Sequence, residues 1–178
     1  MQSAANTADK SSGGLAIVTG ASRGIGKAIA HEFLQQGITV LGVARSFANA
    51  SEASPAAANF IPCAADVTNA DDVKRIIATA QDTKLPLLAL VNNAGVLDPI
   101  AKLGDVEADK WRHNFEVNVV AVLTLTQQAL PMLRATGGRV INVSSGAAVH
   151  AYQGWSAYCS SKAALNMLTK SMAVEEPD

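Results

Sequence analysis

Short β-rich runs alternate with amphipathic stretches along most of the chain. Leu15–Val18 is apolar throughout and is followed, after a glycine-rich break, by apolar residues at helical spacing. Strands that are apolar throughout are typical of a parallel sheet covered by helices on both faces. The pattern therefore predicts one α/β domain of the doubly wound, Rossmann type over residues 15–178. Strands are expected at residues 15–18, 38–43, 60–61, 87–91 and 139–143.

The stretches between these runs predict helices. Asn69 can accept hydrogen bonds from the first backbone N–H groups of the segment that follows it, as an N-cap. Pro131 lies inside the longest amphipathic stretch and predicts an interruption there, because proline lacks a backbone N–H. Helices are expected over residues 25–36, 71–81, 107–134 and 156–174.

Composition and charge narrow the class of partner. The chain has 178 residues, of which 49% are hydrophobic and 16% charged, enough to bury one sizeable core. The net charge is −1 and no run of Lys or Arg occurs. A nucleic-acid or anionic-membrane binder would need such a basic patch, so we expect a small-molecule partner, with no nucleic acid and no membrane.

Cysteine, histidine and apolar-run patterns support a cytoplasmic location. The 2 cysteines are too few for a disulfide framework, and the 3 histidines form no zinc-binding pattern, so no metal is expected. No apolar run reaches the roughly 18 residues of a transmembrane helix. Residues 1–14 are rich in Ser, Ala and Asn and are expected to form a flexible tail, not a signal peptide.

A glycine-rich segment lies between the first expected strand and helix. Thr19–Gly26 has the spacing G-x-x-x-G-x-G, a variant of the G-x-G-x-x-G dinucleotide fingerprint. Glycine lets a phosphate approach the backbone, and N–H groups at a helix start can hold a pyrophosphate. Lys27 is followed by Ala28 where a Walker A loop needs Ser or Thr. A turn that only tightens the corner is the alternative. The predicted cofactor-binding residues here are Gly20, Ser22, Arg23, Gly24, Ile25 and Gly26.

The residue after the second expected strand bears on the choice of cofactor. An Asp or Glu there would accept hydrogen bonds from a ribose 2′-hydroxyl, but the chain has Arg45. Arg45 can pair with a 2′-phosphate, and Arg23 can add a second positive charge. NADP(H) is therefore favoured over NAD(H), with two ordinary surface arginines as the alternative.

Three polar residues near the carboxyl end indicate carbonyl chemistry. Tyr158 and Lys162 are four residues apart, which places them on one face of the last expected helix. A fixed ammonium there would favour the phenolate form, so Tyr158 could exchange a proton with a substrate oxygen near neutral pH. Ser145 lies thirteen residues before Tyr158, with Ser144 as the neighbouring candidate. A packed ring and a solvated cation are the alternative.

Together these segments resemble the short-chain dehydrogenase/reductase family. The landmarks stand in the family's order: Thr19–Gly26, Asp66-Val67, Asn92–Gly95, Asn118, and Ser145 with Tyr158 and Lys162. The resemblance implies that Asp66 and Val67 lie along the adenine. It also implies that Asn93, Ala94 and Gly95 support the central sheet and the cofactor ribose.

The resemblance implies catalytic roles as well. Tyr158 would be the general acid in reduction, and Lys162 would hold the nicotinamide ribose. Ser145 would donate a hydrogen bond to the substrate carbonyl. Asn118 would hold a water in a proton relay behind Lys162, although a buried Asn with satisfied hydrogen bonds is the alternative. The implied activity is that of an NADP(H)-dependent oxidoreductase that acts on a ketone or alcohol.

The resemblance also bears on the branch of the family, on the oligomeric state and on the length of the chain. The sequence around Arg45, Val96 and Trp155 is similar to that of the family branch that contains benzil and sepiapterin reductases. The two long helices correspond to those that the family uses to form homodimers or homotetramers. The family continues past the last helix with further strands and a substrate lid, which this sequence lacks. A non-catalytic NADP-binding or interaction protein is therefore the alternative function.

Overall fold

The structure is a computed structural model and describes residues 13–47 and 58–176. Nearly all of the expected flexible tail, residues 1–12, lies outside these ranges. Within them the strands are β1 Leu15–Thr19, β2 Thr39–Ala44, β3 Phe60–Ala64, β4 Leu87–Asn92 and β5 Arg139–Asn142. The α-helices are α1 Gly24–Gln35, α3 Ala70–Asp82, α4 Ala108–Phe115, α5 Ala121–Thr136 and α6 Ser156–Glu175.

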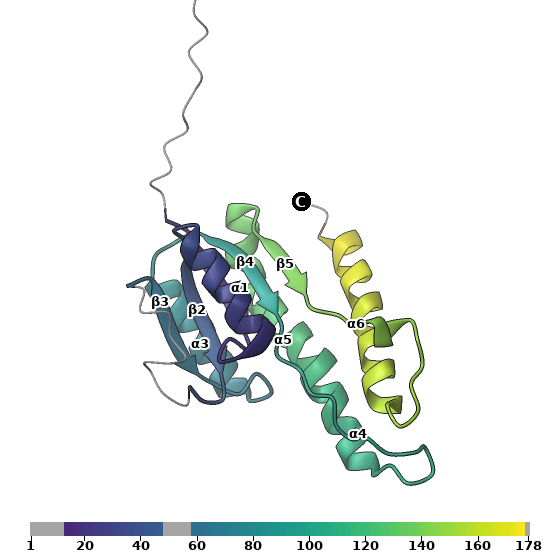
Figure 1. Cartoon of the computed structure of the whole chain (residues 1–178). Coiled ribbons are helices and arrows are strands. Elements are labelled where there is room, and N and C mark those ends of the chain that lie inside the picture. Colours follow the sequence, from purple (N-terminus) through teal and green to yellow (C-terminus); the bar gives the residue numbers. More distant parts are fainter. Residues whose placement is uncertain (1–12, 48–57, 177–178) are drawn as a thin grey trace, which may run out of the picture.

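The described strands form one parallel sheet in the order β3-β2-β1-β4-β5 (Figure 1). β1 lies at its centre, and Ile17 pairs with Leu41 of β2 on one side and with Leu90 of β4 on the other. The strand order reverses between β1 and β4. Loops that leave the carboxyl ends of these two strands diverge there, which opens a crevice where such sheets bind ligands. The predicted doubly wound α/β fold is confirmed.

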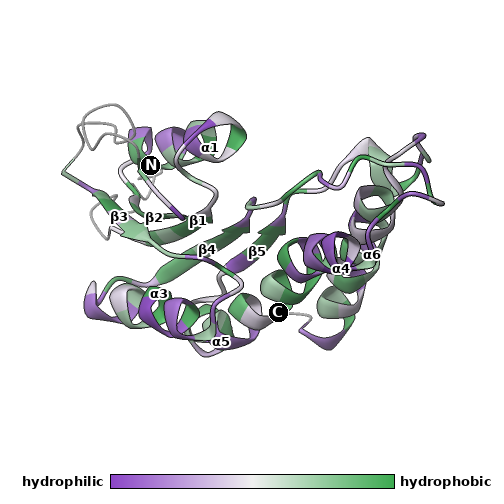
Figure 2. Ribbon diagram, turned by 90° about the horizontal axis from the view of Figure 1, so that it is seen from below, coloured by the Kyte–Doolittle hydropathy of each residue, from purple (hydrophilic) through white to green (hydrophobic). Residues whose placement is uncertain are grey.

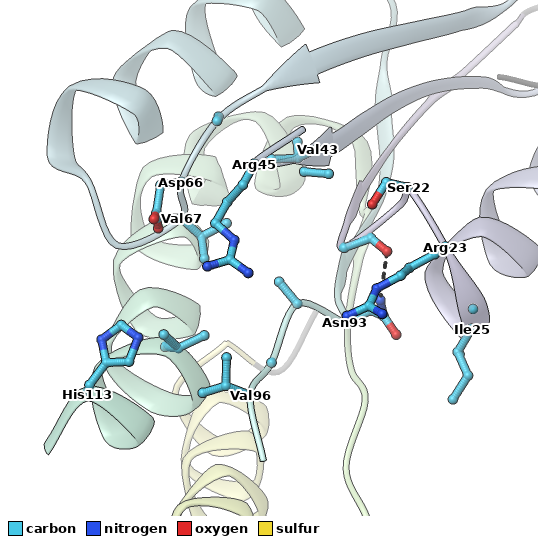
Figure 3. Close-up of a pocket in the computed structure, with 17 residues that line it drawn as sticks. Ser22, Arg23, Ile25, Val43, Arg45, Asp66, Val67, Asn93, Val96 and His113 are labelled. Atoms are coloured by element: carbon cyan, nitrogen blue, oxygen red, sulfur yellow. Dashed lines mark hydrogen bonds between the residues drawn. The ribbon is translucent and has the colours of Figure 1, made fainter. Parts of the chain in front are cut away.

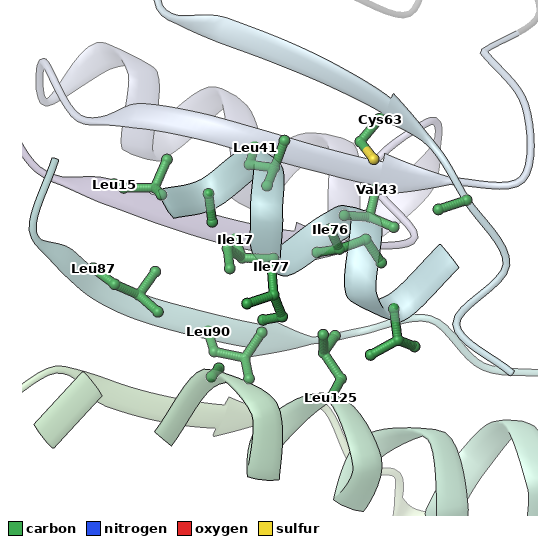
Figure 4. Packing of buried hydrophobic residues seen from close by; sticks show 14 of the residues in the cluster. Leu15, Ile17, Leu41, Val43, Cys63, Ile76, Ile77, Leu87, Leu90 and Leu125 are labelled. Carbon is green, nitrogen blue, oxygen red and sulfur yellow. The ribbon is translucent and has the colours of Figure 1, made fainter. Parts of the chain in front are cut away.

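Helices cover both faces of the sheet (Figure 2). Val18, Val40 and Val91 pack with Ala30 of α1 on one face. On the other face, the larger core cluster joins the sheet to α3 and α5 (Figure 4). This cluster contains Leu15, Ile17, Leu41, Val43, Ile76, Leu87, Leu90 and Leu125. Each fully buried side chain of this size contributes about 1.5–3 kcal/mol, so the two cores hold β1 and β4 rigidly.

β3 extends three residues beyond the expected 60–61 and includes Pro62. The strand pairs only with β2 among the described strands, so it lies at an edge of the sheet. Pro62 is exposed. An edge strand tolerates proline because one side of its backbone needs no ladder hydrogen bond, and this is why the strand does not stop where the sequence suggested.

The prediction that Pro131 interrupts its helix is wrong. α5 continues through Pro131 and ends at Thr136, and Gly137, which has a φ of 61°, is its C-cap. Pro131 is exposed, while Leu125 and Leu133 of the same helix are buried in the larger core cluster. Their burial outweighs the one backbone hydrogen bond that proline cannot donate. The break lies instead at Glu116–Val120, a π-helical turn between α4 and α5.

Asn69 caps α3 as predicted. Its side chain accepts hydrogen bonds from the N–H groups of Asp71 (3.0 Å) and Asp72 (3.1 Å). In the ranges that the structure describes, no helix combines the length and apolar character that a membrane span requires.

Candidate active site

A cavity of about 600 Å³ lies at the crevice between the ends of β1 and β4 (Figure 3). Its size is within the range of small-molecule and cofactor sites. The cavity brings together most of the residues predicted to bind the cofactor. These are Gly20, Ser22, Arg23, Gly24, Ile25, Arg45, Asp66, Val67, Asn93, Ala94 and Gly95.

Gly26 does not line the cavity but packs against the backbone of the glycine-rich turn at Gly20. A Cβ at Gly26 would lie 2.3 Å from the carbonyl oxygen of Gly20 and 2.4 Å from Nδ2 of Asn93. Gly20 itself has a φ of 67°, in the left-handed region that favours glycine. Only glycine therefore permits the tight packing of this turn against the first turn of α1.

The N-terminus of α1 faces this cavity without a protein cap. In the described residues no side chain caps it, and its first turn holds no acidic residue. Gly24 and Ile25, the first helical residues, line the cavity. Backbone N–H groups at a helix start attract anions, and Arg23 adds a positive charge beside them. The residues present thus fit the pyrophosphate of a dinucleotide.

Thr19 and Asn93 fasten the loop after β4 to the glycine-rich turn. The Thr19 hydroxyl accepts hydrogen bonds from the N–H groups of Asn93 and Ala94, both at 3.0 Å. It donates to the carbonyl of Val91 at 3.3 Å. In turn, Nδ2 of the Asn93 side chain donates a hydrogen bond to the carbonyl of Thr19 at 2.9 Å. The two loops that form the walls of the cavity are therefore held in a fixed relation.

The opposite side of the cavity carries charged groups. Arg45 extends into the cavity from the end of β2, near Asp66 and Val67, and His113 of α4 lies below them (Figure 3). The pKa of Asp66 is lowered, first by the backbone N–H of Thr68, then by the Thr68 hydroxyl, and further by the charges of Arg45 and His113. Asp66 therefore stays a carboxylate that can accept hydrogen bonds at neutral pH.

Six residues that line the cavity are not among the predicted cofactor-binding residues. They are Val43, Ala44, Ala65, Val96, His113 and Val117. Ala44, Ala65 and Val96 directly neighbour predicted residues in the chain, and Val43 is two residues from Arg45. His113 and Val117 are four residues apart on the α4 and π-helical segment, the spacing of one helix face. Val117 directly precedes the predicted Asn118 in the chain, but no sequence pattern connects His113 with the cofactor cavity.

Tyr158 and Lys162 stand on α6, outside the lining of the cavity. The Lys162 side chain is buried, with 5% of the residue exposed, and Nζ donates to the carbonyl of Val143 at 2.9 Å. Nζ lies 5.8 Å from the centroid of the Tyr158 ring. Burial lowers the pKa of Lys162. A Cβ at Gly95 would lie 3.7 Å from Lys162 Nζ, so Gly95 links the cavity to the Tyr158 and Lys162 pair.

The two candidate serines differ in what their hydroxyl groups do. Ser144 Oγ donates to Oδ1 of Asn166 at 2.6 Å, which commits its hydrogen. Ser145 Oγ accepts from the N–H of Ala147 at 3.1 Å. Among the residues that the structure describes, the Ser145 hydroxyl donates to none. The turn after Ser145 packs against α6, and of the two hydroxyl groups only that of Ser145 keeps a hydrogen that no described residue accepts.

Asn118 is fully buried, and its side chain already has protein partners. Oδ1 accepts from the N–H of Val96 at 2.9 Å. Nδ2 lies within hydrogen-bonding distance of the Val96 carbonyl, Asn114 Oδ1 and Ser161 Oγ. The predicted water relay is not tested by these contacts.

Other features of the site concern substrate and metal binding. The rings of Tyr152, Trp155 and Tyr158 follow one another, with centroids 5.2 Å and 5.8 Å apart. They form an aromatic row that leads to Tyr158.

Over the described ranges, no group of three or more His, Cys, Asp or Glu side chains is placed to hold a metal ion.

Known proteins share both the sequence and this arrangement. Residues 14–178 match the family model described as short chain dehydrogenase. An uncharacterized oxidoreductase of Schizosaccharomyces pombe is 41% identical over 178 residues, which cover 98% of this chain and 68% of that protein. Benzil reductase ((S)-benzoin forming) of Bacillus subtilis is 32% identical and covers 92% of this chain and 68% of its own length.

A solved structure agrees with these relatives. The crystal structure of the KRED1-Pglu enzyme superposes with a TM-score of 0.88 and 38% identity, over 92% of this chain and 70% of that one. The sequence matches and the shared fold converge on one family of nicotinamide-dependent oxidoreductases. The chain belongs to the short-chain dehydrogenase/reductase family.

Proposed function

We propose that this chain supports the NADPH-dependent reduction of a ketone, and the reverse oxidation of the alcohol, with Tyr158 as the general acid or base. The observation that carries the proposal is the position of the buried Lys162 ammonium. It donates to the Val143 carbonyl, lies 5.8 Å from the centroid of the Tyr158 ring, and is close to Gly95 of the cofactor cavity. A buried lysine with so few partners is unfavourable for stability, which favours a functional reason for it.

The residues on α6 and after β5 would divide the reaction between them. A nicotinamide cofactor, when bound, would supply the hydride for the carbonyl carbon, so that ketone and NADPH would become alcoholate and NADP⁺. Tyr158 donates the hydroxyl proton to the oxygen that becomes negative. Ser145 donates a hydrogen bond to the same oxygen and stabilises its developing charge. Lys162 keeps a positive charge beside the phenol as the proton leaves.

Replacement of single hydroxyl groups tests these roles. Tyr158→Phe removes the proton donor but keeps the ring, so turnover should fall by at least about 10³-fold while NADPH still binds. Tyr152→Phe removes the hydroxyl of the neighbouring ring and is the matched control. The assignment of Tyr158 is wrong if its phenylalanine variant retains the turnover of the control.

The preference for NADP(H) rests on Arg45. Its guanidinium extends into the cavity at the end of β2, where an NAD-selective site would have a carboxylate (Figure 3). Arg45→Ala should raise KM for NADPH about 10-fold or more and leave KM for NADH nearly unchanged, because only NADPH has the 2′-phosphate. Arg139→Ala, an exposed arginine on β5, is the control. A wild-type protein that prefers NADH contradicts this proposal.

The name of the Bacillus relative suggests the substrate class. Benzil is an aromatic vicinal diketone, and the aromatic row Tyr152, Trp155 and Tyr158 could pack against its rings. NADPH oxidation should therefore be detectable with benzil. The control is a simple aliphatic ketone, which should react more slowly. NADPH binding without oxidation of any carbonyl compound would instead support a non-catalytic, cofactor-binding protein.

A further inference from the structure

A buried polar cluster joins α4, α6 and the loop after β4. It consists of Asn114, Asn118 and Ser161, each with 0% of its surface exposed. Figures 1 and 2 show α4 and α6 side by side, and the two helices are in contact. A buried polar side chain is costly unless it is hydrogen-bonded. These three have partners, and most of those partners belong to another segment of the chain.

Asn114 lies at the centre of this cluster. Its Nδ2 is 3.1 Å from the carbonyl oxygen of Val96, 3.2 Å from that of Leu97 and 2.8 Å from that of Asp98. Its Oδ1 accepts from Ser161 Oγ at 2.7 Å. A rotated amide would place an oxygen against three carbonyls. The contacts therefore fix Asn114 in one orientation, with its nitrogen toward the loop and its oxygen toward α6.

Ser161 occupies a special place on α6. It precedes Lys162 directly, and its Oγ lies 3.0 Å from the carbonyl oxygen of Tyr158, one turn earlier. The bond to Asn114 is therefore made between Tyr158 and Lys162. On the other side, the loop that Asn114 holds follows directly after Gly95, which lines the cofactor cavity. Asn114 thus connects the loop beside the cavity to the turn of α6 that lies between Tyr158 and Lys162.

We propose that Asn114 and Ser161 are a pair of positioning residues that set the height and rotation of α6 relative to the cofactor cavity. Apolar packing alone allows a helix to slide or rotate by a fraction of a residue, whereas directed hydrogen bonds fix its register. A displacement of about 1 Å at a reacting group can lower the rate about 10²-fold. This inference rests on the proposed function of Tyr158 and Lys162.

Four single variants separate positioning from general stability. Ser161→Ala and Asn114→Ala each remove one partner of the pair. Ser160→Ala changes the exposed neighbour on the same helix. Thr169→Val removes another α6 hydroxyl, the one that accepts from Asn142 Nδ2 at 2.9 Å, nearly two turns beyond Lys162. Thr169→Val therefore measures what the loss of an ordinary α6 hydrogen bond does.

Turnover and stability should change differently in these variants. Ser161→Ala and Asn114→Ala should lower kcat about 10- to 100-fold, with KM for NADPH within about twofold of wild type. The double variant should lose no more kcat than the more impaired single one, because the pair acts as a unit. Thr169→Val should lower Tm by about as much as Ser161→Ala does, but its kcat should stay at the wild-type value. Equal kcat losses in Ser161→Ala and Thr169→Val would overturn the proposal.

Hydrogen–deuterium exchange supplies a readout that does not depend on turnover. With NADPH bound, Ser161→Ala and Asn114→Ala should speed the exchange of residues 156–162, and Ser160→Ala should not. Unchanged exchange there would overturn the inference. If the wild-type protein binds NADPH but reduces no carbonyl compound, the proposed function fails, and faster exchange confined to residues 156–162 would still support the positioning role.

Discussion

The Thr19 hydroxyl offers the sharpest test of how the site is held together. Thr19 is 2% exposed, and its oxygen is the acceptor for the N–H groups of both Asn93 and Ala94. Thr19→Val replaces the hydroxyl with a methyl group of nearly the same size, so no cavity forms. Two N–H groups lose their acceptor, at about 1–1.5 kcal/mol each because both residues are only half-buried.

Burial of the added methyl group offsets about 0.8 kcal/mol of that loss. The free energy of unfolding should therefore fall by about 2 kcal/mol. Thr19→Ser is the matched control, because it keeps the oxygen and loses only a methyl group, at about 1 kcal/mol. Since Asn93 and Ala94 also line the cavity, NADPH affinity should fall in Thr19→Val and stay near the wild-type value in Thr19→Ser.

Urea unfolding followed by tryptophan fluorescence measures this difference. With an m-value of about 2 kcal/mol/M, the midpoint should drop by roughly 1 M in Thr19→Val and by about half as much in Thr19→Ser. The m-values should not differ between the variants. A valine variant as stable as the serine variant would show that water replaces the lost acceptor, and that the hydroxyl does not hold the two loops together.

Three further changes test other parts of the molecule. Gly26→Ala places a Cβ against the Gly20 backbone, so NADPH affinity should fall at least about 10-fold, whereas Gly104→Ala, with nothing within 4 Å, should leave it unchanged. Lys162→Met should raise Tm at pH 7 by roughly 2–4 °C, because burial lowers the Lys162 pKa and the folded chain holds that proton less tightly than the unfolded chain. The gain should shrink as pH rises toward the ordinary lysine pKa, and a lower Tm would contradict the burial argument. Asn69→Ala should cost about 1 kcal/mol in urea unfolding without changing NADPH affinity, and an unchanged midpoint would show that its cap contributes nothing.

The predictable part of the fold is the part governed by local patterns. Alternation of β-rich and amphipathic segments located every described strand to within a few residues, and α1, α3 and α6 as well, because burial on both faces demands apolar strands, whereas α4, the π-helical turn and α5 were expected as one helical stretch. The errors at Pro62 and Pro131 have one cause. Both rules concern a proline's missing N–H, and whether that N–H is needed depends on the edge of the sheet or on the packing of the helix, which only the tertiary structure decides.

The missed cavity residues have a different cause. His113 lies on α4, far along the chain from the glycine-rich turn and from Arg45. It reaches the same cavity where α4 lies against the loop after β4, to which Asn114 of the same helix is hydrogen-bonded. No local residue preference predicts such a contact. A contact between remote segments is therefore visible only once the loops after β1, β2 and β4 are placed together.

The hydrogen-bond partners of the motif residues also sort them by role, which the sequence pattern cannot do. Asn93 and Asn118 match family landmarks, yet Asn93 Nδ2 donates to the Thr19 carbonyl and both polar atoms of Asn118 have protein partners. Such groups cannot offer the same atoms to a ligand without breaking buried hydrogen bonds, each loss of which costs about 1–3 kcal/mol. Arg45 instead lines the cavity, and the Ser145 hydroxyl, which accepts from the N–H of Ala147, keeps a hydrogen that no described residue accepts. Conservative changes at the asparagines should therefore act through loop and helix geometry, whereas changes at Arg45 and Ser145 should act directly on the cofactor and on the substrate oxygen.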